Sequence, residues 1–155
     1  MRNEYERKLM EFMNHHGTEG DHLSFTHSCH TVADAAKTAN AGAEDFVKNI
    51  CMIDTEGHLI VAIVKGTDRA GTSRVAKALG IERPRPATPE EILEKTGYPC
   101  GGTPSFGYAA IFLVDPKVME TPTVFTGGGS ENSLVKISSE ALLRANGGRL
   151  VRVRK

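Results

Sequence analysis

Apolar residues recur at helical spacing in five segments of the chain, at residues 4–17, 31–42, 72–80, 88–97 and 138–148. In the first segment Tyr5, Leu9 and Phe12 fall on one helical face. The fourth segment has the fullest end signals, because Thr88 can cap the helix and Pro89 takes its first position. These patterns predict five amphipathic helices.

Shorter runs of apolar and β-branched residues predict strands at residues 46–54, 58–65, 110–115, 123–125, 134–138 and 149–154. The first two runs are separated only by the turn 55–57, so they predict an antiparallel hairpin. Hairpins outnumber regular βαβ units along the chain. The pattern therefore indicates a single α+β domain over residues 1–155. We expect a curved mixed or antiparallel sheet that forms a partly closed barrel, with helices packed around it.

The composition is that of a globular protein, with 39% hydrophobic and 25% charged residues among 155. Nineteen basic residues balance nineteen acidic ones, which argues against a protein that coats nucleic-acid backbone but not against contact with one short end. Three cysteines without CxxC spacing predict no disulfide scaffold. No apolar run is long enough to span a bilayer, and the charged N-terminus is unlike a signal sequence. We expect a cytoplasmic protein with no membrane partner.

The stretch TGYPCGGTPSFGY, residues 96–108, contains four glycines and two prolines. A loop this rich in both residues either solves a turn problem or presents backbone groups to a ligand. A second glycine cluster lies in FTGGGSEN, residues 125–132, without the Lys-Ser/Thr pair of a P-loop. Two such loops in one small domain favour a site lined by backbone amides.

Lys48 lies in the otherwise apolar run FVKNICMID. Strand alternation places it on one face with Phe46, Ile50 and Met52. A lysine in this position either supplies a cation to a site or extends its ammonium to water from the end of the strand. The residue pattern alone favours the second interpretation.

Two other chemistries are weighed from the residues. In FTHSCH, His27 and Cys29 would share a strand face while His30 points away, which leaves two ligands where structural zinc needs four. No metal and no other cofactor is therefore expected. Cys100 lies in the glycine-rich loop and could act as a nucleophile only with a base supplied by the fold. No histidine or carboxylate stands in or beside this loop in the sequence.

The order of these motifs resembles the YbaK/prolyl-tRNA-synthetase-associated editing domain family. The resemblance covers about residue 24 to the end, and its motifs are HTVADAA, FVKNICMID, VKGTD, VAKALG, TPEEILEKTGY, GGTPSFG, IFLVD, GGGSEN and LVKISSEALLRANGGRLVRV. The combination of the strand lysine and the glycine-rich loop is its most specific part.

This resemblance implies hydrolysis of mischarged aminoacyl-tRNA by a free-standing, trans-acting member. The expected substrate carries a small amino acid (alanine, cysteine or serine), foremost on tRNA-Pro. The acceptor end of tRNA and a synthetase such as prolyl-tRNA synthetase are the expected partners. The alternative is a non-catalytic module that binds an aminoacyl-adenosine, the acceptor end or a synthetase.

The resemblance also implies site residues. The lysine that the family requires matches Lys48, and its glycine-rich loop matches Gly101 and Gly102, so these three are expected to be catalytic. The residues expected to bind substrate are Thr103, Pro104, Ser105, Gly127, Gly128 and Gly129. Ser105 occupies a position where the family commonly has proline, which leaves the amino-acid specificity open. With no base expected at the loop, a substrate hydroxyl or an ordered water would carry the proton, and the protein would supply position and electrostatics.

Overall fold

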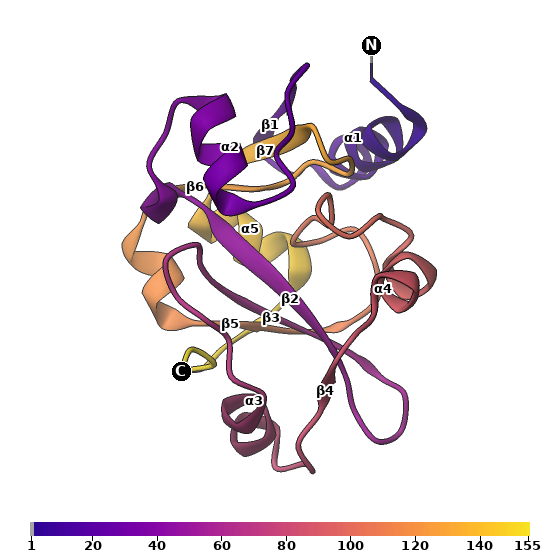
Figure 1. Ribbon diagram of the computed structural model, residues 1–155, viewed down its shortest axis with the longest axis vertical. Helices are drawn as coiled ribbons and strands as arrows, with labels where there is room; N and C mark the ends of the chain where they lie inside the picture. The colour runs from indigo at the N-terminus through magenta and orange to yellow at the C-terminus, as the bar shows by residue number, and fades with distance from the viewer. Residues whose placement is uncertain (1) are drawn as a thin grey trace.

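Two β-sheets form the frame of the computed structural model, which describes residues 2–155 (Figure 1). The antiparallel three-stranded sheet has the order β1 (Gly20–Ser24), β7 (Ser133–Ser138) and β6 (Thr123–Gly127). The mixed five-stranded sheet has the order β4 (Arg85–Pro86), β2 (Val47–Ile53), β3 (Leu59–Lys65), β5 (Ile111–Val114) and β8 (Arg149–Leu150).

Five α-helices cover these sheets: α1 (Glu4–His16), α2 (Val32–Ala39), α3 (Thr72–Leu79), α4 (Pro89–Thr96) and α5 (Ser139–Asn146). Two short 3-10 helices, η1 (Ala43–Asp45) and η2 (Pro116–Glu120), precede β2 and follow β5. α1 and α2 lie with the three-stranded sheet, whereas α3 lies against the far side of the five-stranded sheet (Figure 1). The chain is thus a single α+β domain, as the sequence predicts.

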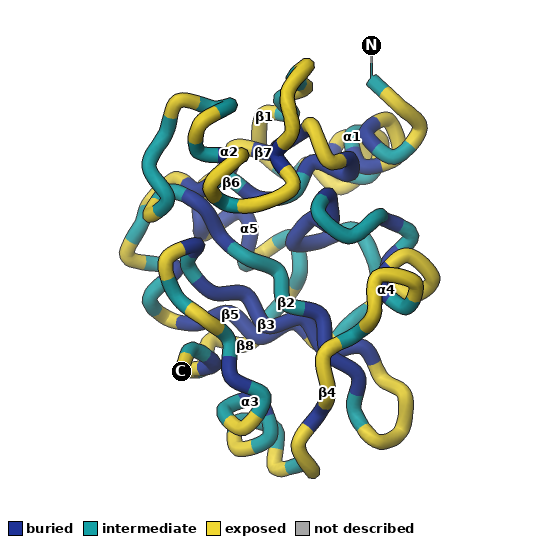
Figure 2. The backbone as a smooth tube through the Cα atoms, in the orientation of Figure 1, coloured by how far each residue is buried: buried dark blue, intermediate teal, exposed yellow. Residues whose placement is uncertain are grey.

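β3 is the central strand of the larger sheet and its residues Leu59–Val64 are all buried (Figure 2). Val61 and Ile63 face the main core between the sheets, whereas Ile60 and Val64 face the smaller core beneath α3. Burial on both faces explains why this segment reads as a continuous apolar run. The predicted antiparallel hairpin is confirmed, because β2 and β3 pair from Val47–Lys65 to Ile53–Leu59.

The predicted helix ends agree with the structure where the capping residues are most distinctive. The Thr88 side chain accepts from the Glu91 N–H, the Glu91 carboxylate accepts from the Thr88 N–H, and Gly97 ends α4 in the left-handed conformation. α2 ends earlier than expected, at Ala39, because Asn40 already adopts a left-handed conformation. β1 is a polar strand that the hydrophobic pattern does not reveal.

The prediction of a partly closed barrel is wrong. β6 is an edge strand, and residues 47–50 of β2 pair with β3 on one side only. A single bridge, Phe46–Phe125, joins the two edges. Beyond it, the Asn49 amide donates to the Thr103 carbonyl and the Thr126 hydroxyl, so a side chain and a loop replace the ladder that would close a barrel. We call this boundary between β2 and β6 the seam.

The predicted strand at residues 149–154 is also mostly wrong, because only Arg149–Leu150 pair with β5. The buried Asp115 carboxylate accepts instead from the backbone N–H groups of Val153 and Arg154, both at 3.0 Å. Its other oxygen accepts from the Arg154 guanidinium at 2.6 Å and from the Lys117 N–H at 3.0 Å. The Asp115 carboxylate, together with an isolated bridge between Ala70 and Arg154, therefore holds the C-terminal segment where a longer ladder was expected.

Within residues 2–155, no helix is both long enough and apolar enough to cross a membrane.

Replacing Asp115 with asparagine should destabilise the fold by about 3 kcal/mol at pH 7, near the lower end for a broken buried pair, because Arg154 can still reach water. Burial of the Asp115 carboxyl disfavours its charge, but the hydrogen bonds from Lys117, Arg154 and Val153 outweigh this and lower its pKa. A lowered folded-state pKa stabilises the protein above the unfolded value of about 3.9, and this contribution is lost as pH falls through the folded-state value. Urea denaturation from pH 7 to pH 3 measures both effects.

The matched control is Glu120→Gln, an exposed carboxylate in η2, which should change stability by less than about 0.5 kcal/mol. Equal stability of Asp115→Asn and the parent at pH 7 would contradict the assignment, as would a difference that grows on acidification.

Candidate functional site

The seam holds a cavity of about 190 Å³. β2 and β6 form two of its walls, the glycine-rich loop a third, and the start of α2 its outer part. Eighteen residues line it: Cys29, His30, Thr31, Val32, Ala35, Phe46, Val47, Lys48, Asn49, Ile50, Ile92, Cys100, Gly101, Thr103, Phe125, Thr126, Gly127 and Leu134. The gap that prevents barrel closure therefore lies where the sequence places its candidate site.

Lys48 lines this cavity from β2 and is half-buried. Of the residues that strand alternation places on its face, Ile50 and Met52 pack in the core beneath α3, whereas Phe46 packs in a separate cluster with Ala35 and Leu134. Its ammonium donates to the Asp68 carbonyl at 2.7 Å, in the connection between β3 and α3. An ammonium has three protons, so two remain for a ligand. The structure thus shows a half-buried lysine that lines the cavity while its ammonium is held by a backbone carbonyl.

The first glycine loop contributes two lining residues, Gly101 and Thr103. Gly101 has a φ of +90°, and a Cβ there would collide with the His30 ring. Gly102 does not line the cavity. A Cβ on Gly102 would lie 2.6 Å from the Ser130 carbonyl carbon, so this glycine permits contact with the second glycine cluster.

The second glycine cluster supports the first loop more than it lines the cavity. Only Gly127 reaches the cavity wall, and a Cβ there would collide with the Thr103 carbonyl. The Gly129 N–H donates to the Gly102 carbonyl at 2.8 Å, while Gly128 packs against the backbone of β7. The two loops are therefore built against each other, and this packing fixes the position of the cavity wall.

Pro104 and Ser105 are buried behind the wall instead of facing the cavity. The Pro104 carbonyl accepts from the Tyr108 hydroxyl at 2.7 Å. Ser105 has no exposed surface and hydrogen-bonds to two lining residues, Asn49 and Thr126. Ser105 thus does not face the cavity but holds two of its lining side chains in place.

Asn49 and Thr126 are site residues that the sequence interpretation missed. Asn49 follows Lys48 and points to the opposite face of β2, toward Thr103 and Thr126. Thr126 is 1% exposed and comes from β6. The sequence did contain a signal for both residues, since each is a polar residue inside an otherwise apolar strand. A buried polar side chain needs hydrogen-bond partners, so such a residue indicates a contact with another polar group.

The expectation that no histidine or carboxylate lies beside the glycine-rich loop is wrong in three dimensions. His30, just before α2, lines the cavity and its ring lies against Gly101. Its Nδ1 is 3.2 Å from a carboxylate oxygen of Glu131, which follows the second glycine cluster. Both side chains are about half exposed, at 47% and 59%. Residues 31–95 separate His30 from the loop, so no local sequence pattern brings them together.

In the described part of the chain, none of the three thiols is hydrogen-bonded to a histidine. Cys29 and Cys100 line the cavity, and Cys51 lies in the core nearby. Burial, followed by the proximity of Cys100, raises the pKa of Cys51 to about 12, and burial raises that of Cys29 to about 11, so both are protonated thiols at neutral pH. Within residues 2–155, no hydrogen bond joins the Cys100 sulfur to a histidine.

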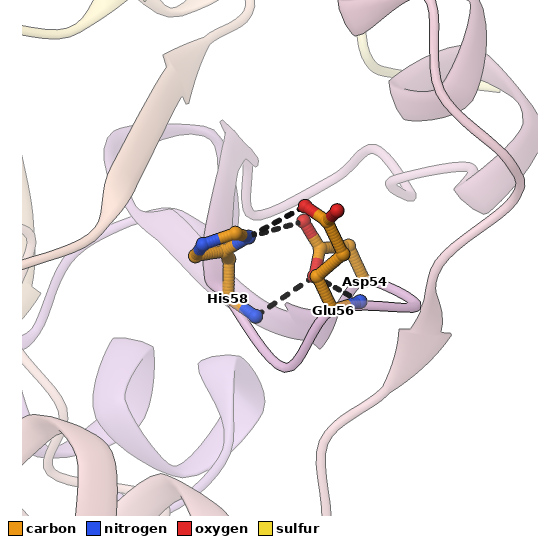
Figure 3. Close-up of side chains that lie close together, drawn as sticks. All are labelled: Asp54, Glu56 and His58. Carbon is orange, nitrogen blue, oxygen red and sulfur yellow. Dashed lines mark hydrogen bonds and ion pairs between the residues drawn. The ribbon is translucent and has the colours of Figure 1, made fainter.

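The histidine and cysteine residues of FTHSCH do not form a metal cluster in residues 2–155. The one described group with suitable spacing is Asp54, Glu56 and His58, in the exposed turn at the other end of β2 (Figure 3). Asp54 accepts there from the backbone N–H groups of Glu56 and His58, and its second oxygen is 3.0 Å from His58 Nδ1. These bonds, the His58 N–H first, lower the pKa of Asp54. They stabilise the hairpin turn.

Comparisons with known proteins identify the family of the chain. A family model described as the aminoacyl-tRNA editing domain matches residues 26–145. The uncharacterized protein YwhH of Bacillus subtilis (strain 168) is 28% identical over 127 residues, which cover 80% of each chain.

Two solved structures share the fold along their whole length. Hypothetical protein APE2540 has 27% identity and a TM-score of 0.88, covering 96% of this chain and 99% of its own. A candidate trans-editing enzyme for prolyl-tRNA synthetase has a TM-score of 0.91 at 23% identity, covering 100% of this chain and 99% of its own. The family model spans most of the sequence and includes the cavity walls contributed by α2, β2, the glycine-rich loop and β6. The chain therefore belongs to the aminoacyl-tRNA editing domain family.

Proposed function

We propose that residues 1–155 act as one free-standing editing domain that hydrolyses the ester of mischarged aminoacyl-tRNA in trans. The observation that carries the proposal is that Lys48 and the glycine-rich loop both line one small cavity. Family membership supports an editing role. Ester hydrolysis, and the side chains and backbone groups that carry it out, are proposed in addition. The domain needs no cofactor in this scheme. It would act in the cytoplasm on the acceptor end of tRNA, alongside a synthetase such as prolyl-tRNA synthetase.

The size of the cavity supports a small acyl group. At about 190 Å³ it is below the roughly 300–1,000 Å³ of pockets for drug-sized ligands. Val32, Ala35, Phe46 and Leu134 supply apolar surface from α2, the start of β2 and β7. Alanine, cysteine and serine are the amino acids that we propose as substrates, with tRNA-Pro as the foremost carrier.

Charge stabilisation would come from the loop and the lysine. Within residues 2–155, the N–H groups of Gly101 and Thr103 donate to no protein acceptor, and both residues line the cavity. Two such donors suit the oxyanion of a tetrahedral intermediate, where losing one donor typically costs about 2.7–4 kcal/mol. Lys48 would hold the terminal adenosine phosphate or the same oxyanion with its two remaining protons.

Proton transfer is assigned to His30. The imidazole would take a proton from the water that attacks the ester carbonyl carbon, with Glu131 orienting the ring. When the carbon–oxygen ester bond breaks, the imidazolium would return the proton to the leaving ribose oxygen. The products are the free amino acid and deacylated tRNA.

One prediction of the proposed function concerns Lys48. Wild-type protein should deacylate at least one of Ala-, Cys- or Ser-tRNA in a panel on tRNA-Pro and other tRNAs, and Lys48→Ala should reduce that rate about 100-fold or more, as for loss of a transition-state contact. Lys77→Ala, an exposed lysine of α3, is the matched control and should retain the wild-type rate. Full activity in folded Lys48→Ala would refute the role of the lysine. A silent panel with synthetase binding intact would favour the non-catalytic module.

The second prediction concerns His30. Replacing it with glutamine should lower kcat by about 100-fold with little change in KM, because general acid–base transfer contributes about 10²–10⁴-fold. Single-turnover kinetics separates chemistry from binding, and His58→Gln in the remote hairpin turn is the control. An unchanged kcat in His30→Gln would assign the proton to a substrate hydroxyl or an ordered water.

A further inference from the structure

Three polar side chains at the cavity wall, those of Asn49, Ser105 and Thr126, form a closed hydrogen-bonded ring. Ser105 Oγ is 2.6 Å from Asn49 Oδ1 and 2.7 Å from Thr126 Oγ1, and Asn49 Nδ2 is 3.0 Å from Thr126 Oγ1. Asn49 Nδ2 is also 3.0 Å from the Thr103 carbonyl oxygen. Ser105 and Thr126 are 0% and 1% exposed. We call these three side chains the seam ring.

The direction of every bond in the seam ring follows from the Thr103 carbonyl. A carbonyl only accepts, so the Asn49 amide must turn its NH₂ toward Thr103 and its oxygen toward Ser105. The Asn49 oxygen also only accepts, so the Ser105 hydroxyl proton is committed to it. In the Ser105–Thr126 contact the proton must therefore come from Thr126.

These hydrogen-bond directions determine whether the wall can donate a proton to a ligand or only accept one. Both Asn49 N–H protons and both hydroxyl protons are used inside the ring or on Thr103. The polar side chains of the ring that line the cavity, Asn49 and Thr126, retain only lone pairs, and the Thr103 carbonyl adds another. This part of the cavity wall is an acceptor surface with no proton to donate.

We propose that the seam ring binds the α-ammonium group of the aminoacyl ester, and that Ser105 is the positioning residue that keeps the wall an acceptor. The proposal rests on the proposed function, since it names the group by which that site recognises its substrate. An ammonium brings three N–H donors and no lone pair, which complements a wall of acceptors. A site built to receive N–H groups rejects analogues that lack them, because its buried acceptors stay unpaired.

Ser105 determines this selectivity through the Thr126 proton. Without the Ser105 hydroxyl, the Thr126 hydroxyl has no acceptor behind the wall and is free to turn its proton into the cavity. The wall would then present a donor to a cation. Proline, which has no hydroxyl, could not accept the Thr126 proton. Ser105 therefore has a role that the proline common in the family could not fill.

The test compares two esters that differ in one group, alanyl-tRNA and its α-hydroxy counterpart lactyl-tRNA. Wild-type protein should hydrolyse alanyl-tRNA with the higher kcat/KM, and Ser105→Ala should reduce the alanyl-to-lactyl ratio of kcat/KM about 10- to 100-fold, the range for a hydrogen bond to a charged group. A purely structural effect of Ser105 would lower both rates equally and leave the ratio unchanged. Equal use of both esters by wild type, or an unchanged ratio in Ser105→Ala, would overturn the proposal.

Thr126→Val provides a second variant of similar shape that removes the acceptor itself, and it should reduce the ratio in the same way. Thr123→Val, on the exposed side of the same strand, is its matched control and should keep the wild-type ratio. Thermal melts establish that each variant is folded before the ratios are compared.

If wild type hydrolyses neither of these two esters, the ring is tested by equilibrium binding of non-hydrolysable amide analogues. The proposed function itself fails only if Cys- and Ser-tRNA are not hydrolysed either. Calorimetry with 3′-alanylamido- and 3′-lactylamido-adenosine should then show tighter binding of the alanyl compound, with the preference lost in Ser105→Ala. Equal affinity, or no binding of either analogue, would overturn the proposal.

Discussion

Asn49 donates both of its amide protons across the seam, one to the Thr103 carbonyl and one to the Thr126 hydroxyl. In a closed barrel this region would contain backbone hydrogen bonds between β2 and β6. A side chain reaches farther than a ladder bond, so the strands stay apart and the glycine-rich loop occupies the space at their edges. The cavity exists because a side chain, and not a backbone ladder, joins β2 and β6. Its polar wall and the position of the loop amides depend on the same feature.

The glycines make the arrangement possible at the level of packing. Gly102 and Gly127 have no side chain because the backbone of the opposite loop occupies the space where a Cβ would lie. The loops therefore support each other by contact, and one hydrogen bond from Gly129 to Gly102 fixes their register. Rigid support of this kind suits an oxyanion site, where donors must be in place before charge develops.

Much of the fold could be predicted because its signals are local. The capping residues of α4 and the apolar run of β3 depend on neighbours in the sequence, and their positions agree with the structure. The C-terminal strand could not be predicted in this way, because the distant Asp115 carboxylate takes the N–H groups that a ladder would use. The barrel prediction failed for a similar reason, since the partners that Asn49 binds across the seam are distant in the sequence.

The candidate site, like the fold, could be predicted from the sequence only in part. Lys48 and the glycine-rich loop could be selected from the sequence, whereas His30 reaches Gly101 only through the folded chain. Ser105 stood out as a departure from the family pattern, but its hydrogen bonds to Asn49 and Thr126 required the structure.

The central claim is that the seam between the sheets receives the aminoacyl end of the substrate. The most direct measurement is amide chemical-shift mapping of the ¹⁵N-labelled protein titrated with 3′-alanylamido-adenosine. The account predicts that the largest shifts occur at residues 47–50, 100–103 and 125–127. Shifts concentrated elsewhere, with these three segments unchanged at saturation, would contradict it.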